Sequence, residues 1–196
     1  QDRCYRLYMD DFLTNKELFA LVEVMIGARA FSKMELLTLT EKLKRFTTTE
    51  DRPKLNELIR KEIYHYPEVK HDCESVQETL WQLINCITEK REISIDYYRM
   101  DRKWVTHRLC PASVMFTDYY FYLIAFDSEK DTAKPYYFRV DRIKEITVHR
   151  KKRATFDAMT FNEGELRKRS LFMWPGKLRT IRFEFGGPSV QAVLDK

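Results

Sequence analysis

The chain has 196 residues, of which 44% are hydrophobic and 33% are charged, with five glycines and six prolines. This composition excludes a disordered chain, a collagen-like chain and a Pro/Gly-rich low-complexity chain, and it leaves few places for a glycine-rich phosphate loop. The net charge of +5 equals that of residues 91–153 alone (14 basic, 9 acidic), because residues 1–90 carry −2 and residues 154–196 carry +2.

Helically spaced apolar residues predict four helices within residues 1–90. Capping boxes, in which a hydroxyl and a carboxylate each bond a backbone N–H at the helix start, indicate where three of the helices begin. The pairs are Thr14 with Glu17, Ser32 with Glu35, and Ser75 with Glu78. Pro53 can open the remaining helix. We expect a helical scaffold here, with no visible chemistry.

Apolar and polar residues alternate from Ile93 to Tyr98, which is the period of a half-buried strand. Further strand candidates follow at 105–110, 119–126, 136–140 and 146–149, separated by turn residues. Five short strands at this spacing predict a small antiparallel barrel or sandwich over residues 91–153. In the last part of the chain we expect a helix at 162–168, a strand at 178–185 and a helix opened by Ser189.

Four segments of the strand-rich region carry a family pattern. They are Ile93–Tyr97, His107–Pro111, Tyr119–Ala125 and Phe138–Ile143. In this order and at this spacing they resemble the WYL domain of bacterial transcription regulators. The Trp-Tyr-Leu that names the family is replaced here by Phe121-Tyr122-Leu123, which keeps an aromatic residue and removes an indole N–H donor.

The resemblance also covers the flanking regions, because residues 12–45 are similar to the helical linker that precedes WYL domains and residues 155–196 to the start of a C-terminal extension. It implies an α+β fold in three parts. These are a helical N-terminal linker or dimerisation region (1–90), a small Sm-like or SH3-like antiparallel β-barrel (91–153), and a truncated α+β extension (154–196). The winged helix-turn-helix that would bind DNA is missing and the chain opens on Gln1, so we expect a fragment of a longer regulator.

The resemblance further implies a ligand site on the basic face of the barrel, with Arg139 and Arg142 as candidates. A guanidinium group can hold a phosphate through two parallel hydrogen bonds. Residues three apart in a regular strand point to opposite faces, so one of these arginines is expected to be structural unless the strand ends or bulges between them. We expect Arg139 to face the anion, and Asp141 to pair with a nearby arginine or to cap the following turn. The alternative for Arg139 is a weak surface salt bridge.

Aromatic and basic residues complete the candidate ligand site. Tyr97 shares the face of the apolar residues of its strand, so its ring can pack in the core while its hydroxyl reaches a phosphate. The basic residue that WYL domains carry before the proline falls on His107 or Arg108, and alternation lets only one of them face the pocket. Tyr119 and Phe121 belong to a strand that is apolar on both faces, which favours the core, although an exposed ring could stack a base.

The remaining features point away from catalysis. The run His71-Asp72-Cys73 lacks a second His/Cys cluster that would complete a zinc site, and there is no serine elbow, P-loop or Rossmann fingerprint. We therefore expect no enzyme, no metal and no cofactor. The basic run 149–153 is either a solvated linker or a phosphate contact. The four cysteines form no CxxC pair, no leader is present and no apolar run reaches about 18 residues, which predicts a cytoplasmic protein without a membrane span.

These observations favour the ligand-sensing and dimerisation portion of a transcription regulator. An anionic effector, either a nucleotide or a short single-stranded nucleic acid, would bind the barrel and shift a homodimer that sets the spacing of the DNA-binding domains. Two alternatives remain open at this stage. One is a dimerisation and interaction scaffold that binds no ligand, and the other is an RNA-binding accessory protein.

Overall fold

The computed structural model describes residues 13–117, 119–129, 135–152, 180 and 182–187. The chain divides into two units, residues 1–161 and 162–196, and the helices and strands described here all lie in the first. The predicted helices at 162–168 and after Ser189 lie outside the described residues. Of the predicted strand at 178–185, the described residues 180 and 182–185 are not in a strand.

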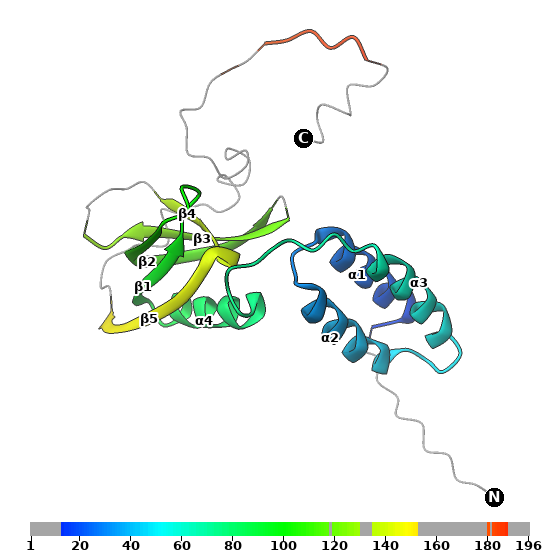
Figure 1. Cartoon of the computed structure of the whole chain (residues 1–196). Helices are drawn as coiled ribbons and strands as arrows, with labels where there is room; N and C mark the ends of the chain where they lie inside the picture. Colours follow the sequence, from blue (N-terminus) through cyan, green and yellow to red (C-terminus); the bar gives the residue numbers. More distant parts are fainter. Residues whose placement is uncertain (1–12, 118, 130–134, 153–179, 181, 188–196) are drawn as a thin grey trace, which may run out of the picture. The chain divides into compact units, whose positions relative to one another are not determined.

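The four predicted helices are present (Figure 1). They are α1 (Asn15–Ala28), α2 (Lys33–Leu43), α3 (Arg52–Tyr64) and α4 (Val76–Thr88), with a short 3₁₀ helix, η1 (Lys44–Phe46), after α2. Thr14 and Ser32 close the two predicted capping boxes of α1 and α2. Ser75 caps α4 by accepting from the backbone N–H of Glu78, but its own hydroxyl hydrogen goes to Glu35 at 2.8 Å.

The first three helices share one apolar core. Its fully or nearly fully buried side chains come from each helix and from the second residue after α3: Leu18, Val22, Ile26, Leu36, Leu55, Ile59, Ile63 and Tyr66. On α1 and α3 these residues recur every four positions, which places them on one helix face. The predicted helical scaffold therefore has a hydrophobic interior of its own.

Five antiparallel strands follow in the order β4-β3-β2-β1-β5. Their bounds are β1 (Arg91–Tyr98), β2 (Trp104–Thr117), β3 (Tyr120–Asp127), β4 (Tyr136–Arg139) and β5 (Ile143–Lys152), with the 3₁₀ helix η2 (Val140–Arg142) between the last two. β2 runs seven residues beyond the predicted strand end at 110, because a register shift between Pro111 and Ser113 accommodates the proline without ending the strand. α4 covers the sheet with Leu83 and Cys86, which join its buried core.

The sheet is curved but does not close into the barrel that the resemblance implied. No hydrogen-bonded ladder joins β4 to β5 in the described part of the chain, so these two strands remain edges. A flat sheet would hold them about 19 Å apart at about 4.8 Å per strand. The four Cα steps from Arg139 to Ile143 span at most about 15 Å, so the sheet must bend. The α+β class is confirmed, and the closed barrel is corrected to an open, bent sheet whose edge strands are joined by η2.

Candidate functional site

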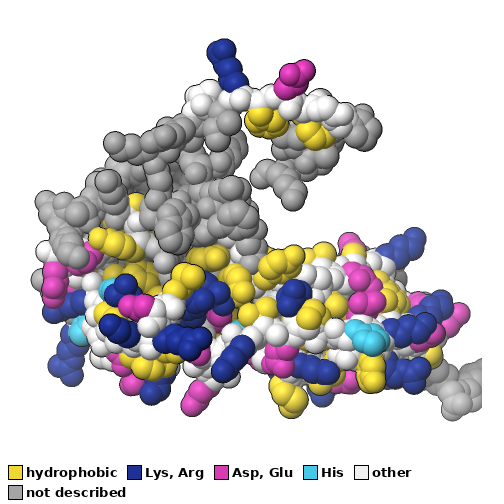
Figure 2. Space-filling view, turned by 45° about the horizontal axis from the view of Figure 1, so that its top comes forward, with side chains coloured by type: hydrophobic (Ala, Val, Ile, Leu, Met, Phe, Trp, Pro, Cys, Tyr) yellow, Lys and Arg dark blue, Asp and Glu magenta, His cyan; other side chains and the backbone are white. Residues whose placement is uncertain are grey.

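A basic depression lies where three segments of the chain meet. Lys70 and Asp72 come from the linker between α3 and α4, Tyr98, Arg99, Met100 and Arg102 from the β1–β2 hairpin, and Arg139 and Arg142 from the two ends of η2. Its volume is about 280 Å³. Five of these eight side chains are cationic and one, Asp72, is a carboxylate. Figure 2 shows several Lys and Arg side chains grouped over the sheet part of the molecule. The net positive charge of this depression favours an anionic ligand.

Backbone hydrogen bonds fix the three segments against one another. The Asp141 carbonyl accepts from the N–H groups of both Asp72 and Cys73, at 2.8 and 3.1 Å, which ties η2 to the linker. In the hairpin, the Arg99 N–H donates to the Lys103 carbonyl at 2.9 Å and the Arg102 N–H to the Arg99 carbonyl at 3.0 Å. Arg102 has φ 63°, the left-handed conformation that a tight hairpin turn requires. The cationic side chains are therefore carried on hydrogen-bonded backbone.

Arg139 is held by its neighbours. Its Nε and Nη2 donate to the two carboxylate oxygens of Asp141 at 3.0 and 2.6 Å, and its guanidinium lies 3.4 Å from the centroid of the Tyr120 ring. The Arg139 and Asp141 side chains are only 18% and 5% exposed. Burial lowers the pKa of Arg139, but the bonds and charge of Asp141 outweigh it and leave this pKa above its ordinary value. The pairing expected for Asp141 is present, and Arg139 is its partner.

Arg142 is the less constrained of the two arginines that the sequence singled out. The strand ends at Arg139 and η2 turns the chain through three residues, so strand alternation no longer sets the direction of Arg142. Both arginines consequently line the same depression. This is the exception that the sequence argument left open, in which the strand ends between them.

Two further candidates, Tyr97 and His107, are packed within the sheet. The Tyr97 hydroxyl accepts a hydrogen bond from the backbone N–H of Arg139 at 3.2 Å, and burial raises the pKa of this tyrosine. Its ring lies 5.2 Å from that of Phe138, and the His107 ring lies 5.1 Å from the same phenylalanine. Neither Tyr97 nor His107 lines the basic depression. The structure brings Arg139 and Arg142 together there, and it leaves Tyr97 and His107 outside.

The last three candidates lie elsewhere. Arg108 is exposed on β2 and donates to the buried Glu92 at 3.0 Å. Tyr119 is exposed in the β2–β3 turn with φ 72°, and the Arg29 guanidinium lies 5.3 Å from its ring. Phe121 is half-buried against the core of the sheet. None of the three is part of the basic depression.

Sequence reasoning missed Lys70, Arg99 and Arg102 in this depression. Two of them belong to the stretch between the first two strands, where the sequence offered a usable signal, since Arg99, Arg102 and Lys103 place three cations in one tight hairpin. Lys70 had no such signal. It is brought to the site by a linker whose path depends on the hydrogen bonds to Asp141.

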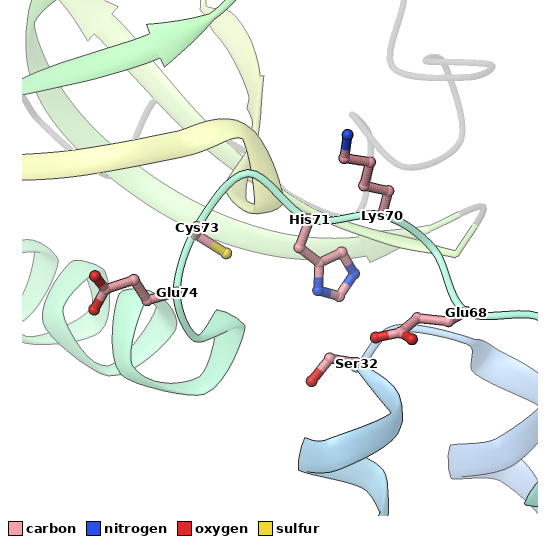
Figure 3. Close-up of a pocket in the computed structure, with 6 residues that line it drawn as sticks. All are labelled: Ser32, Glu68, Lys70, His71, Cys73 and Glu74. Carbon is pink, nitrogen blue, oxygen red and sulfur yellow. The ribbon is translucent and has the colours of Figure 1, made fainter.

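A second depression, of about 400 Å³, lies along the same linker and the start of α2 (Figure 3). In Figure 3 Ser32 and Glu68 approach each other, while Lys70 points away from them. Burial is the largest cause that raises the pKa of the Cys73 thiol here to about 11, with the charges of Asp141 and Glu35 adding to it. Such a thiol holds its proton at neutral pH and is a poor nucleophile. No group of three or more His, Cys, Asp or Glu side chains among the described residues is placed to hold a metal ion.

A comparison with known protein families identifies the domain that contains this sheet. Residues 78–148, from α4 into β5, match the WYL domain family. The chain contains a WYL domain. The resemblance predicted from the four sequence segments is thus confirmed, and the matched region includes most of α4 as well as the strands.

Two solved structures are similar to this WYL protein. One is proteasome accessory factor B/C (PafBC) of Arthrobacter aurescens, with 16% identity and a TM-score of 0.38 over 77% of this chain and 22% of that one. The other is a CRISPR Cas-related protein, with 18% identity and a TM-score of 0.36 over 80% of this chain and 47% of that one. The chain thus spans less than half the length of either protein. No curated protein matches it.

None of the described helices combines the length and hydrophobicity that a bilayer span needs.

Proposed function

We propose that this chain is the ligand-sensing portion of a transcription regulator, and that an anionic effector binds the basic depression of its WYL domain. The observation that carries the proposal is the convergence of five cationic side chains from three segments on one depression with a single carboxylate. Solvated surface charges are normally interspersed in sign, and a concave cluster of one sign raises the local concentration of oppositely charged ligands. The effector class we favour is a nucleotide or a short single-stranded nucleic acid.

The cations of the depression divide into two kinds. Arg139 already uses Nε and Nη2 on Asp141, so it offers a ligand at most its remaining N–H groups. Arg99 is exposed and lies 3.6 Å from Asp101, a weak pairing that a phosphate can compete with. Arg102 and Arg142 form no ion pair among the described contacts. These two arginines are therefore our principal ligand contacts, with Arg139 as the structural member of the set.

The position of the site suggests how binding is transmitted. Lys70 and Asp72 lie on the linker between the helical scaffold and the WYL domain, so a ligand that contacts Lys70 stabilises one arrangement of this linker. In a homodimer, that preference would alter the spacing of DNA-binding domains carried outside this chain. The proposal assigns the chain no catalytic step, and it places the regulator in the cytoplasm with its DNA.

Isothermal titration with nucleotides and short oligonucleotides at low salt tests the site. We expect binding to weaken at least tenfold when Arg102→Gln and Arg142→Gln are combined, because each change removes a positive charge and keeps a polar side chain. Arg52→Gln combined with Arg60→Gln on α3 is the matched control, since it removes the same number of charges from a helix that does not line this depression. Absence of binding at low salt, or equal weakening by the control, would overturn the proposal.

One observation favours the second candidate, a scaffold that dimerises without a ligand. Trp81 and Ile84 on α4 are 63% and 43% exposed, and at a spacing of three residues they share one helix face. A scaffold would be a dimer whether or not nucleotides are present, and would show no ligand-dependent rise in melting temperature. A ligand at about 100 times its Kd should instead stabilise a sensor by about 2.7 kcal/mol.

A further inference from the structure

A pair of aromatic side chains lies on the outer face of the sheet, outside both hydrophobic cores. Tyr98 at the end of β1 and Trp104 at the start of β2 are directly opposite each other in the antiparallel ladder. Their ring centroids are 4.8 Å apart and the ring planes are inclined by 42°. Trp104 is 49% exposed, so about half of this large side chain is accessible to a partner.

Strand alternation explains why the pair is not in the core. Ile93, Ile95 and Tyr97 of β1 face the buried side, where Tyr97 packs on Phe138. Tyr98 therefore faces the opposite side, together with its cross-strand partner Trp104. An exposed tryptophan at the tip of a basic hairpin adds little to the core, so packing does not account for it.

The aromatic pair is continuous with the basic depression. Tyr98 both contacts Trp104 and lines the depression beside Arg99 and Arg102. The Lys144 ammonium lies 5.5 Å from the Trp104 ring centroid. Carboxylates are also present nearby, since Asp96 accepts from Thr106 on the same face and Asp101 pairs with Arg99. Arg99, Arg102 and Lys144 thus lie near the aromatic pair together with these carboxylates.

We propose that Tyr98 and Trp104 form a stacking platform for a nucleobase whose adjoining phosphate is held by the arginines of the depression. This inference rests on the proposed function, which favours a nucleotide or a single strand, and it adds the residues that contact the base of such a ligand. An aromatic ring can stack on any base, whereas cations alone would hold inorganic phosphate equally well. The side-by-side arrangement of ring and arginines matches the two chemically different parts of a nucleotide.

Binding of two decamers of equal phosphate number tests the platform. The probes are dT10 and an abasic decamer, titrated into the whole chain at low salt. Loss of one base stack corresponds to about a 5- to 150-fold loss of affinity. We expect Trp104→Ala to weaken dT10 by this factor and to leave the abasic decamer unchanged. Tyr64→Ala is the matched control, because Tyr64 is also an exposed aromatic residue but lies on α3, outside the depression, and it should change neither.

A second measurement does not depend on the alanine variant folding. Trp81→Phe combined with Trp174→Phe leaves Trp104 as the last of the three tryptophans. Its fluorescence should be quenched by dT10 and by thymidine monophosphate but not by the abasic decamer. Quenching by both thymine ligands indicates a nucleotide site, and quenching by dT10 alone indicates a strand.

The results separate the platform from the anion site. If Arg102→Gln and Arg142→Gln weaken dT10 while Trp104→Ala does not, and Trp104 is not quenched, the platform is wrong and the anion site stands. If neither decamer binds at low salt, the proposed function fails as well. Equal weakening of both decamers by Trp104→Ala would also overturn stacking, because the abasic strand has no base to stack.

Discussion

At the scale of single residues, Arg139 is the side chain whose role the structure changes most. It was expected to face an anion, and it lines the depression, but its guanidinium is committed to a buried carboxylate and to the Tyr120 ring. A buried ion pair broken on one side leaves an uncompensated charge. Loss of ligand binding in an Arg139 variant would therefore not by itself identify a ligand contact.

We predict that Arg139→Ala lowers the free energy of unfolding by about 3–5 kcal/mol, since it leaves the buried Asp141 carboxylate without its ion-pair partner. Arg142→Ala, three residues away and without such a pair, should cost less than about 1 kcal/mol. Urea denaturation followed by circular dichroism measures both. Similar values for the two variants would contradict the structural role given to Arg139.

A second residue-scale prediction concerns Cys73. Burial raises the pKa of its thiol to about 11, whereas an unfolded cysteine has a pKa of about 8.5. The folded state thus binds the thiol proton more tightly, so this contribution to stability is complete below about pH 8.5 and is lost as pH rises towards 11. Iodoacetamide at pH 8 should alkylate Cys73 at least about a hundredfold more slowly in the folded chain than in urea. Mass spectrometry of the peptides reads this out, and equal rates would refute the burial.

At the scale of elements, one carboxylate joins two helix starts. Glu35 Oε2 accepts from the Ser32 backbone N–H and hydroxyl at the start of α2, both at 3.0 Å. Its Oε1 accepts from the Ser75 hydroxyl and the Gln77 N–H at the start of α4, at 2.8 and 3.3 Å. A negative charge is favourable at both helix N-termini. Glu35 therefore connects the helical scaffold to the helix that covers the sheet.

We predict that Glu35→Gln lowers the free energy of unfolding by about 1–3 kcal/mol. Both carboxylate oxygens of Glu35 accept hydrogen bonds, whereas the amide of Gln has one acceptor oxygen, and its NH₂ group would face N–H or O–H donors that it cannot bond. Burial opposes the ionised form, yet the bonds from Ser32, Ser75 and Gln77 leave the pKa of Glu35 below its ordinary value. The stability it confers is thus present above about pH 4.3 and is lost as pH falls through the lower folded pKa.

Glu17→Gln is the control for this element-scale prediction. Glu17 forms the same capping box with Thr14 but is exposed and bridges to no second helix among the described contacts. Thermal unfolding between pH 3 and 7 should show a large, acid-sensitive loss only for Glu35→Gln. Equal losses in the two variants would mean that the bridge to α4 contributes nothing.

Elements were more predictable than the contacts between them. Helix starts such as Thr14 and Ser32 could be placed because capping is local, and the strands because alternation is local. Only half of the third capping box was predicted correctly: the Ser75 hydroxyl accepts from the Glu78 N–H, but its own hydrogen goes to Glu35, forty residues away in the chain. β2 was predicted too short because nothing in the sequence showed that a register shift would carry it past Pro111.

At the scale of the whole molecule, the candidate site depends on tertiary packing. The sequence placed the positive charge in residues 91–153 and singled out Arg139 and Arg142, both of which line the depression. It gave no reason to add Lys70, which reaches the depression through the linker bonded to Asp141. The other end of that linker is also fixed, because Arg29 donates to the Pro67 carbonyl at 3.0 and 2.8 Å. The depression, the linker and the helical scaffold are thereby connected through hydrogen bonds.

The charge distribution yields a last prediction, the dependence of dT10 affinity on salt. Each phosphate neutralised on a single strand contributes about −0.7 to the slope of log K against log salt concentration. Arg102→Gln and Arg142→Gln should each make the slope less negative by about 0.7, whereas Arg60→Gln should leave it unchanged. Trp104→Ala should lower the affinity at every salt concentration with the slope preserved, because stacking releases no counterions. Titrations from 50 to 300 mM NaCl measure both quantities; a slope altered as much by Arg60→Gln as by Arg102→Gln would mean that the whole surface, rather than the basic depression, attracts the strand.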